Sequence, residues 1–187
     1  EGHYAWVNSK ALEIANITRH TENPSYGMIG KDENGEPNGL LYEKAMDAVI
    51  VHGYDFTKEQ KRELFTNFLT HAAGLGVTSV HDLFAIEALE MLNDYDIFKE
   101  FEDNGDLTAR IHLWPALNGN LERVKKVRDT YQSDKLRVSG LKQFIDGVIT
   151  ARTAYLLEPY ADQPNTRGES SFPPETIKKW VVDADKE

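Results

Sequence analysis

The chain has 187 residues, of which 40% are hydrophobic and 28% are charged, an ordinary balance for a folded globular protein. Its formal net charge of −10 argues against non-specific binding to nucleic acid, because the phosphates would repel it. It contains no cysteine, which excludes disulfides and thiolate metal sites without fixing the compartment.

No apolar run is long enough to span a bilayer, no basic amphipathic patch indicates a membrane surface, and no signal peptide is visible. The sequence begins at Glu1 without a starting methionine, so we expect that both ends are cut. The localisation, cytoplasmic or exported, is therefore left open.

The first 55 residues predict a small subdomain. A helix is expected over residues 5–16, with His3 just before it as a surface or capping histidine. Residues 26–43 predict a β-hairpin, because Asn34-Gly35 supplies the positive backbone angles that a tight turn needs. A further helix is expected over residues 44–51.

From residue 56 the pattern changes to helices that alternate with short strands. Thr57 and Gln60 match a capping box at the start of a helix that ends near Ala73 and buries an apolar face. The expected core residues of this helix are Leu64, Phe65, Phe68 and Leu69. The strands are expected over residues 77–82, 107–114 and 136–146, and the further helices over 86–102, 120–131 and from Pro173 onward. Such alternation predicts a parallel sheet.

The strand over residues 136–146 places Lys142 among apolar neighbours. A lysine in such a place is costly unless it is paired, neutralised or chemically used, and burial favours the neutral, nucleophilic amine. The alternative is structural: Lys142 forms an ion pair with Asp146 or extends its charged end to water at the strand end.

Chemistry in parallel sheets gathers at the carboxyl ends of the strands, which here carry His81-Asp82, Trp114 and Asp146-Gly147, with His112 slightly earlier. Histidine and carboxylate could bind a metal or move protons there, or could cap loops and satisfy buried hydrogen bonds. The chain contains no HxH, HExxH, P-loop or GxSxG motif.

Five stretches together resemble one family. They are GHYAWVNSKAL (residues 2–12), DENGEPNGLLYE (32–43), GVTSVHD (76–82), KQFIDG (142–147) and RTAYLLEPYAD (152–162). Their order and spacing resemble the YtcJ-like branch of the metal-dependent amidohydrolases, known as amidohydrolase family 3. Each motif alone is weak, but the set covers nearly the whole chain.

The resemblance implies a fold of the α/β class, a (β/α)₈ TIM barrel with insertions. Because a complete barrel needs about 250 residues, residues 56–187 would form a partial TIM-barrel segment with about strands two to four. Residues 1–55 would be an inserted subdomain of helix, β-hairpin and helix. A self-contained flavodoxin-like domain, closed as a three-layer sandwich, is the alternative fold.

The resemblance also implies a metal-dependent hydrolase that cleaves a carbon–nitrogen bond of amide type with metal-activated water. Lys142 would be a ligand of a divalent metal, with zinc expected, either as the amine or as a carbamate formed with carbon dioxide. Asp146 would be catalytic, and His3 and Trp6 would lie on the substrate side.

The other metal ligands of the family would lie outside this sequence, so the isolated chain is expected to lack the metal and to be inactive. The expected partners are a small amide-type substrate and the remainder of the barrel, or a second copy of the chain, but no nucleic acid and no membrane. The alternative function is a non-catalytic regulatory or binding protein on the same scaffold.

Overall fold

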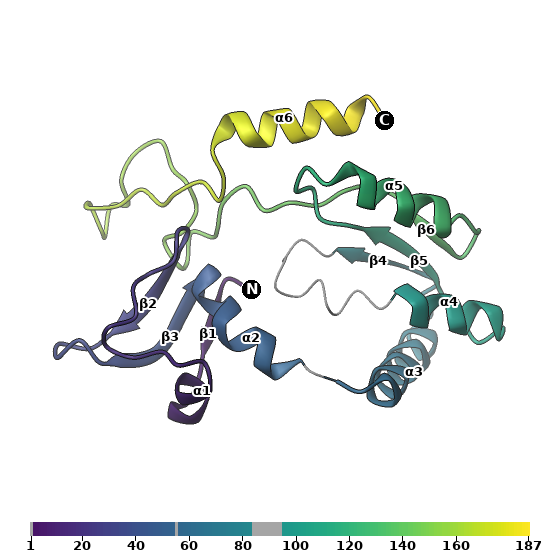
Figure 1. Cartoon of the computed structure of the whole chain (residues 1–187), viewed down its shortest axis with the longest axis horizontal. Helices are drawn as coiled ribbons and strands as arrows, with labels where there is room; N and C mark the ends of the chain where they lie inside the picture. Colours follow the sequence, from purple (N-terminus) through teal and green to yellow (C-terminus); the bar gives the residue numbers. More distant parts are fainter. Residues whose placement is uncertain (1, 55, 84–94) are drawn as a thin grey trace. The chain divides into compact units, whose positions relative to one another are not determined.

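A computed structural model describes residues 2–54, 56–83 and 95–187 (Figure 1). The chain divides into two compact units. The first comprises Glu1–Tyr54 with Phe144–Lys178, and the second comprises Asp55–Gln143 with Lys179–Glu187. Each unit has its own hydrophobic core. Across the described residues, no helix combines the length and the apolar character needed to cross a bilayer.

The first unit is built on a small antiparallel sheet with the strand order β1-β3-β2. Its elements are β1 (Tyr4–Trp6), α1 (Ser9–Ile14), β2 (Gly27–Lys31), β3 (Pro37–Glu43), the 3₁₀ helix η1 (Lys44–Met46) and α2 (Asp47–Gly53). The predicted hairpin is confirmed: β2 pairs with β3, and Gly35 adopts the positive φ of 80° that the turn needs.

The predicted helix over residues 5–16 is wrong at its start. Residues 4–6 form β1 instead, because they pair with the middle strand β3, with Trp6 opposite Leu40. The helix begins only after Asn8, whose side chain accepts a hydrogen bond from the Ala11 amide at 2.9 Å. Pairing with a distant strand therefore outweighs the local helical pattern.

Residues 144–178 pack with the first 54 residues, although they were predicted to belong with the segment that starts at residue 56. Ser171 donates its amide to the Ile145 carbonyl at 2.8 Å, and the buried Tyr160 hydroxyl donates to the Ala154 carbonyl at 2.7 Å. These bonds join parts of the long irregular segment to one another. The order of helices and strands does not reveal this arrangement.

The second unit contains a three-stranded parallel sheet in the order β4-β5-β6, as the alternation predicted. Its elements are α3 (Lys58–Gly74), β4 (Ser79–Leu83), α4 (Tyr95–Asp103), β5 (Arg110–Trp114), α5 (Leu121–Thr130) and β6 (Leu136–Val138), and α6 (Pro174–Asp185) ends in this unit. The structure describes α4 from Tyr95 only, so the predicted helical residues 86–94 lie outside the described part.

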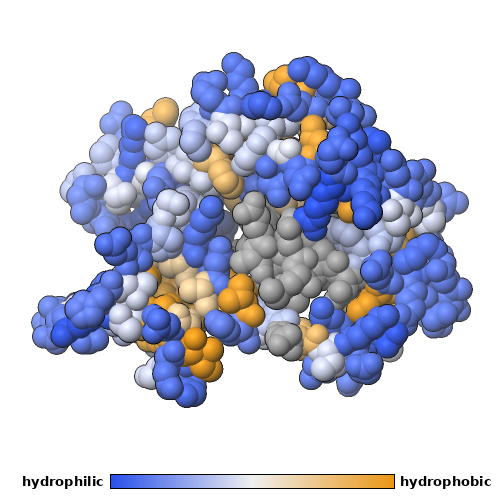
Figure 2. Space-filling model, in the orientation of Figure 1, coloured by the Kyte–Doolittle hydropathy of each residue, from blue (hydrophilic) through white to orange (hydrophobic). Residues whose placement is uncertain are grey.

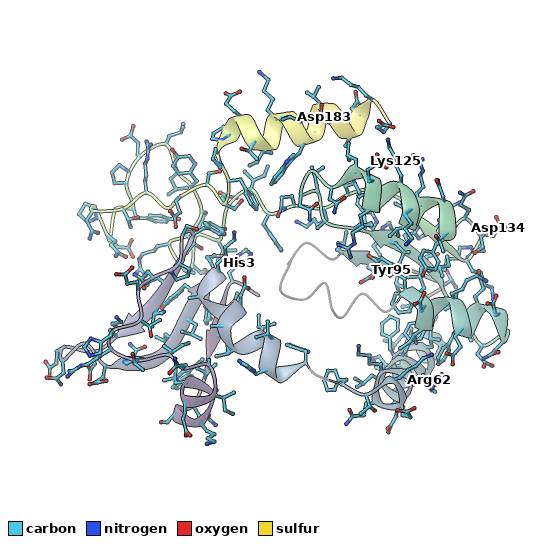
Figure 3. All side chains as sticks on the ribbon, in the orientation of Figure 1. His3, Arg62, Tyr95, Lys125, Asp134 and Asp183 are labelled. Carbon is cyan, nitrogen blue, oxygen red and sulfur yellow. The ribbon has the colours of Figure 1, made fainter. Side chains whose placement is uncertain are left out.

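The helices cover one face of the parallel sheet. Ile111, Leu113 and Leu136 on that face are fully buried against residues of α3 and α4. A two-pronged ion pair also joins these helices: Arg62 donates from Nε and Nη2 to the Glu100 carboxylate at 2.7 and 2.9 Å (Figure 3). The opposite face carries polar and aromatic side chains, which form the candidate site of this unit.

The capping box at Thr57 is confirmed, but α3 buries a narrower stripe than predicted. Phe65, Leu69 and Ala72 are buried, at the spacing of one helical face. Leu64 and Phe68 precede two of these residues and are about 100° away around the helix, so they remain 52% and 43% exposed. The side of the chain shown in Figure 2 is mainly hydrophilic, in keeping with its 31 acidic and 21 basic residues.

Candidate functional site

A buried carboxylate–histidine pair lies in the first unit. Nδ1 of His3 (Figure 3) is 3.0 Å from Oε2 and 3.1 Å from Oε1 of Glu43. The two side chains are only 12% and 7% exposed. A carboxylate can only accept a hydrogen bond, so Nδ1 of His3 carries a proton, and in the neutral ring Nε2 keeps its lone pair. The neutral His3 ring would therefore be suited to accept a proton or to bind a cation at Nε2.

Backbone strain surrounds this pair. Tyr26, Glu43 and Arg152 adopt positive φ angles of 54°, 48° and 57°, which side chains other than glycine rarely accept. All three line one pocket of about 290 Å³ in the first unit. Left-handed backbone of this kind is costly, and it often occurs at binding sites.

The Glu43 carboxylate also approaches the turn that contains Asp146. A Cβ atom at Gly147 would overlap Oε1 of Glu43 and Oγ1 of Thr153, so the turn requires glycine. Burial raises the pKa of the Tyr26 hydroxyl, and the negative charges of Glu43 and Asp146 raise it further. Tyr26 therefore stays protonated beside two carboxylates.

The predicted site residues of the first unit differ in their surroundings. His3 is largely buried, and its ring contacts Phe144 edge to face at 5.4 Å between centroids. Asp146 is half-buried and accepts a hydrogen bond from the Tyr155 amide at 2.9 Å. Trp6 is 83% exposed on the small sheet, so the structure groups His3 with the Asp146 turn and leaves Trp6 outside that group.

The second unit carries a different group of side chains, on the sheet face that its helices leave open. The rings of His81 and His112, opposite each other on β4 and β5, stack at 4.9 Å between centroids. Trp114 donates from Nε1 to Nδ1 of His81 at 2.8 Å. His112 shares a hydrogen bond of 2.7 Å between Nδ1 and Oγ of Ser139.

The Trp114 contact fixes the form of the His81 ring. An indole N–H can only donate, so Nδ1 of His81 must accept, and the ring is neutral with its proton on Nε2. The Trp114 ring is itself held in place, because it lies where a Cβ atom of Gly140 would be. We name His81, His112, Trp114 and Ser139 the open-face cluster.

The predicted pair His81-Asp82 is separated by the alternation of the strand. His81 points to the open face, whereas Asp82 points to the other side, where burial raises the pKa of its carboxyl. The pKa of His112 is lowered, first by desolvation and then by the neighbouring His81, Arg137 and Arg110. His112 is therefore neutral over a wider pH range than an isolated histidine.

Lys142 is half-buried in the second unit, beyond the end of β6. The predicted strand over 136–146 is wrong in length, because β6 ends at Val138. Parallel pairing resumes locally: the Lys142 amide donates to the Pro115 carbonyl at 2.9 Å, and its carbonyl accepts from the Leu117 amide at 2.8 Å. Lys142 thus lies at the carboxyl end of the sheet.

Among the described residues, no group of three or more histidine, cysteine, aspartate or glutamate side chains could hold a metal ion. The role of Lys142 as a ligand therefore stays a prediction. Glu43 was not among the predicted site residues. A signal was available, because Gly39, Leu41 and Glu43 alternate on the buried side of β3 and place an acid among apolar neighbours.

Comparisons with known proteins agree with the resemblance in the sequence. The model of the amidohydrolase family matches residues 1–187. The chain is 32% identical over 185 residues to the protein named "Putative amidohydrolase YtcJ" from Bacillus subtilis (strain 168), covering 96% of this chain and 34% of that protein. It is 30% identical over 193 residues to "Protein LONG AFTER FAR-RED 3" from Arabidopsis thaliana, covering 100% of this chain and 33% of that protein.

A solved structure is also similar, a crystal structure of an uncharacterized metal-dependent hydrolase from Pyrococcus horikoshii OT3. The TM-score is 0.66 at 25% sequence identity, with 98% of this chain and 35% of that chain covered. The chain therefore spans about a third of the length of the relatives that it matches. Its mixed α/β fold with a parallel sheet and its match over the full sequence show that it belongs to the amidohydrolase family.

Proposed function

We propose that this chain is part of a metal-dependent hydrolase that cleaves carbon–nitrogen bonds of amide type with metal-activated water. In this proposal the second unit contributes about strands two to four of a TIM barrel, and the rest of the barrel comes from a longer polypeptide. The family match, the similar metal-dependent hydrolase and the parallel sheet support it.

The observation that carries the proposal is the position of Lys142. It follows the third parallel strand, at the carboxyl end where barrel enzymes place their chemistry, and two backbone hydrogen bonds to the chain after β5 hold it there. A half-buried amine at this edge is suited to become a ligand, as the amine or as a carbamate. The carbamate forms when the neutral amine adds to carbon dioxide and loses a proton.

The described residues do not complete a metal site, and one ligand cannot hold a catalytic ion. We infer that the isolated chain is inactive and that the whole protein supplies the remaining ligands. The ion, with zinc proposed, would activate water and polarise an amide carbonyl when bound.

The first unit would then contribute to substrate binding. His3 is fixed by Glu43 with the Nε2 lone pair left to accept a proton, and Asp146 lies in the turn that approaches the same carboxylate. We propose His3 and Trp6 as substrate-side residues and Asp146 as the catalytic carboxylate. Trp6, largely exposed, is available for an apolar part of a substrate.

Two measurements test this function. In calorimetry the purified 187-residue chain should show only weak zinc binding, and it should hydrolyse no N-acyl substrate. In the longer polypeptide Lys142→Ala should lower both the bound metal and the hydrolysis at least tenfold, whereas the control Lys126→Ala, at an exposed position on α5, should change neither.

Tight, stoichiometric zinc binding by the 187-residue chain would contradict the proposed division of ligands. Full metal content and hydrolysis in the Lys142→Ala polypeptide would contradict the role of Lys142. A longer polypeptide that binds no metal and hydrolyses no amide would instead support the alternative, a regulatory or binding protein on the same scaffold.

A further inference from the structure

The open-face cluster presents a hydrogen-bond donor that none of the described residues uses. Since Trp114 occupies Nδ1 of His81, the ring proton is on Nε2, and no described residue accepts a hydrogen bond from it. His81 is exposed, and its ring cannot exchange donor for acceptor without losing the bond to Trp114. The site therefore favours a ligand atom that accepts.

The same face is positively charged in a protein whose net charge is −10. The strand register places Arg137 beside His112, and Arg110 is two residues before His112 on β5, so these side chains share one face. Both arginines are exposed, and neither lies within 4.0 Å of a carboxylate oxygen among the described residues. With no carboxylate of the described residues that close, the charge of these arginines favours an anion.

Distance separates the roles of these groups. Arg137 is on β6 and His81 is on β4, two strands apart in the sheet. At about 4.8 Å for each strand spacing, the two backbones are about 10 Å apart. This backbone spacing is about one Debye length at 0.1 M salt, so the charge of Arg137 attracts an anion bound at His81 most strongly at low salt. His81 is the contact residue, and the arginines supply the field.

Two apolar side chains lie next to the Nε2 donor of His81. Leu83 lies opposite Trp114 in the register and is 54% exposed, and the indole of Trp114 is held over Gly140 beside His81. A ligand that places an anionic oxygen at Nε2 of His81 can therefore pack an aromatic or aliphatic group against Leu83 and Trp114.

We propose that the open-face cluster binds the carboxylate of a small ligand that has an apolar body. If the chain is part of the proposed hydrolase, on which this reading of the ligand as substrate rests, then the amide substrate carries a carboxylate group. A carboxylate suits the site better than phosphate, because His81 supplies a single N–H donor, whereas phosphate is typically bound by several donors together.

The test uses the 187-residue chain and benzoate, followed by NMR of the Trp114 indole N–H and of the His81 ring nitrogens. Long-range ¹H–¹⁵N spectra should show the His81 proton on Nε2, and benzoate should shift both sets of signals with saturation in the millimolar range. Benzamide, which has the same ring without the charge, and inorganic phosphate should each bind at least fivefold more weakly.

Single substitutions distinguish the hydrogen bond from His81 from the longer-range attraction of the arginines. His81→Phe keeps a ring for stacking but removes the donor, and should raise the benzoate Kd about tenfold, the value of one hydrogen bond to a charged group. Trp114→Phe should raise it about threefold, because the proton is no longer confined to Nε2. Arg137→Gln should raise it about twofold, and only at low salt.

The control variants are His71→Phe, at an exposed histidine on α3, and Arg128→Gln, whose arginine is already paired with Asp129; both should bind benzoate like the parent chain. Equal binding of benzoate and benzamide, preference for phosphate, or an unchanged Kd in His81→Phe with an intact core spectrum would overturn the proposal. Because the assay needs neither metal nor hydrolysis, failure of the proposed function in the longer polypeptide leaves this result unaffected.

Discussion

Two histidines, one in each unit, hold their ring protons on opposite nitrogens. Nδ1 of His3 faces the Glu43 carboxylate, which only accepts, so Nδ1 carries the proton. Nδ1 of His81 faces the Trp114 indole, which only donates, so Nε2 carries it. The same side chain is thus prepared to accept in the first unit and to donate in the second, and the chemical nature of one neighbour decides which.

The two arrangements also differ in burial. The His3–Glu43 pair is almost enclosed and joins residues 40 positions apart, whereas the Trp114–His81 pair lies on an open sheet face between adjacent strands. A buried charge that loses its partner is costly, but an exposed group can turn to water. Disrupting the first pair should therefore cost mainly stability, and disrupting the second should change mainly the tautomer.

The largest expected effect is at Glu43. Glu43→Ala leaves the buried His3 ring without its acceptor and should lower the stability of the first unit by about 3 kcal/mol. Amide hydrogen exchange at Leu41, whose side chain is fully buried in this unit, measures the loss. The tautomer of His81 should not change.

Two further variants sharpen this result. Glu43→Gly should be less damaging than Glu43→Ala by about 1 kcal/mol, because glycine accepts the φ of 48° without strain. Glu13→Ala removes an exposed partner of Lys10 and should change stability by less than about 0.5 kcal/mol. If Glu43→Ala matched Glu13→Ala, the buried pair would have no stabilising role.

A smaller effect is expected at Gly140. Gly140→Ala places a methyl group where the Trp114 ring lies, so the indole must move away from His81. Overpacking of this kind should cost about 2 kcal/mol in the second unit, measured by amide exchange at Leu113. The ring proton of His81 should then distribute over both nitrogens, while His3 keeps its proton on Nδ1.

The matched control is Gly74→Ala at the end of α3, where nothing lies within 4 Å of an added Cβ atom. It should be neutral or stabilise the chain by up to about 1 kcal/mol, the difference in helix propensity. A His81 ring that keeps its Nε2 proton in Gly140→Ala would show that the indole does not set the tautomer.

The difference between contacts of nearby residues and contacts of distant residues explains how far the sequence could predict the structure. Residues close together in the sequence determine three features that the structure confirms: the hairpin turn at Asn34-Gly35, the capping box at Thr57 and the parallel sheet. Strand β1 and the joining of residues 144–178 to the first unit depend on partners far along the chain, which local periodicity does not report.

The candidate site divides in the same way. Lys142 and the histidines of β4 and β5 could be placed near strand ends because alternation and strand order fix them. The indole–imidazole bond could not be predicted, since it depends on Gly140 making room for the Trp114 ring. The His3–Glu43 pair required the register of β1 on β3 before the two residues could be seen as neighbours.

The smallest expected effect is a dependence on pH of the stability of the second unit, through His112. The pKa of His112 lies below its usual 6.5, through desolvation first and then through the neighbouring His81, Arg137 and Arg110. Since the unfolded chain binds a proton more readily than the folded chain in this range, stability should fall as pH drops from 6.5 through the lowered pKa. Arg137→Gln should raise the pKa of His112 at low salt and less so at high salt, because the interaction is screened. An NMR titration of the ring protons measures this, with Arg128→Gln as the control. An unchanged pKa in Arg137→Gln would mean that desolvation alone, and not the positive field of the open face, keeps His112 neutral.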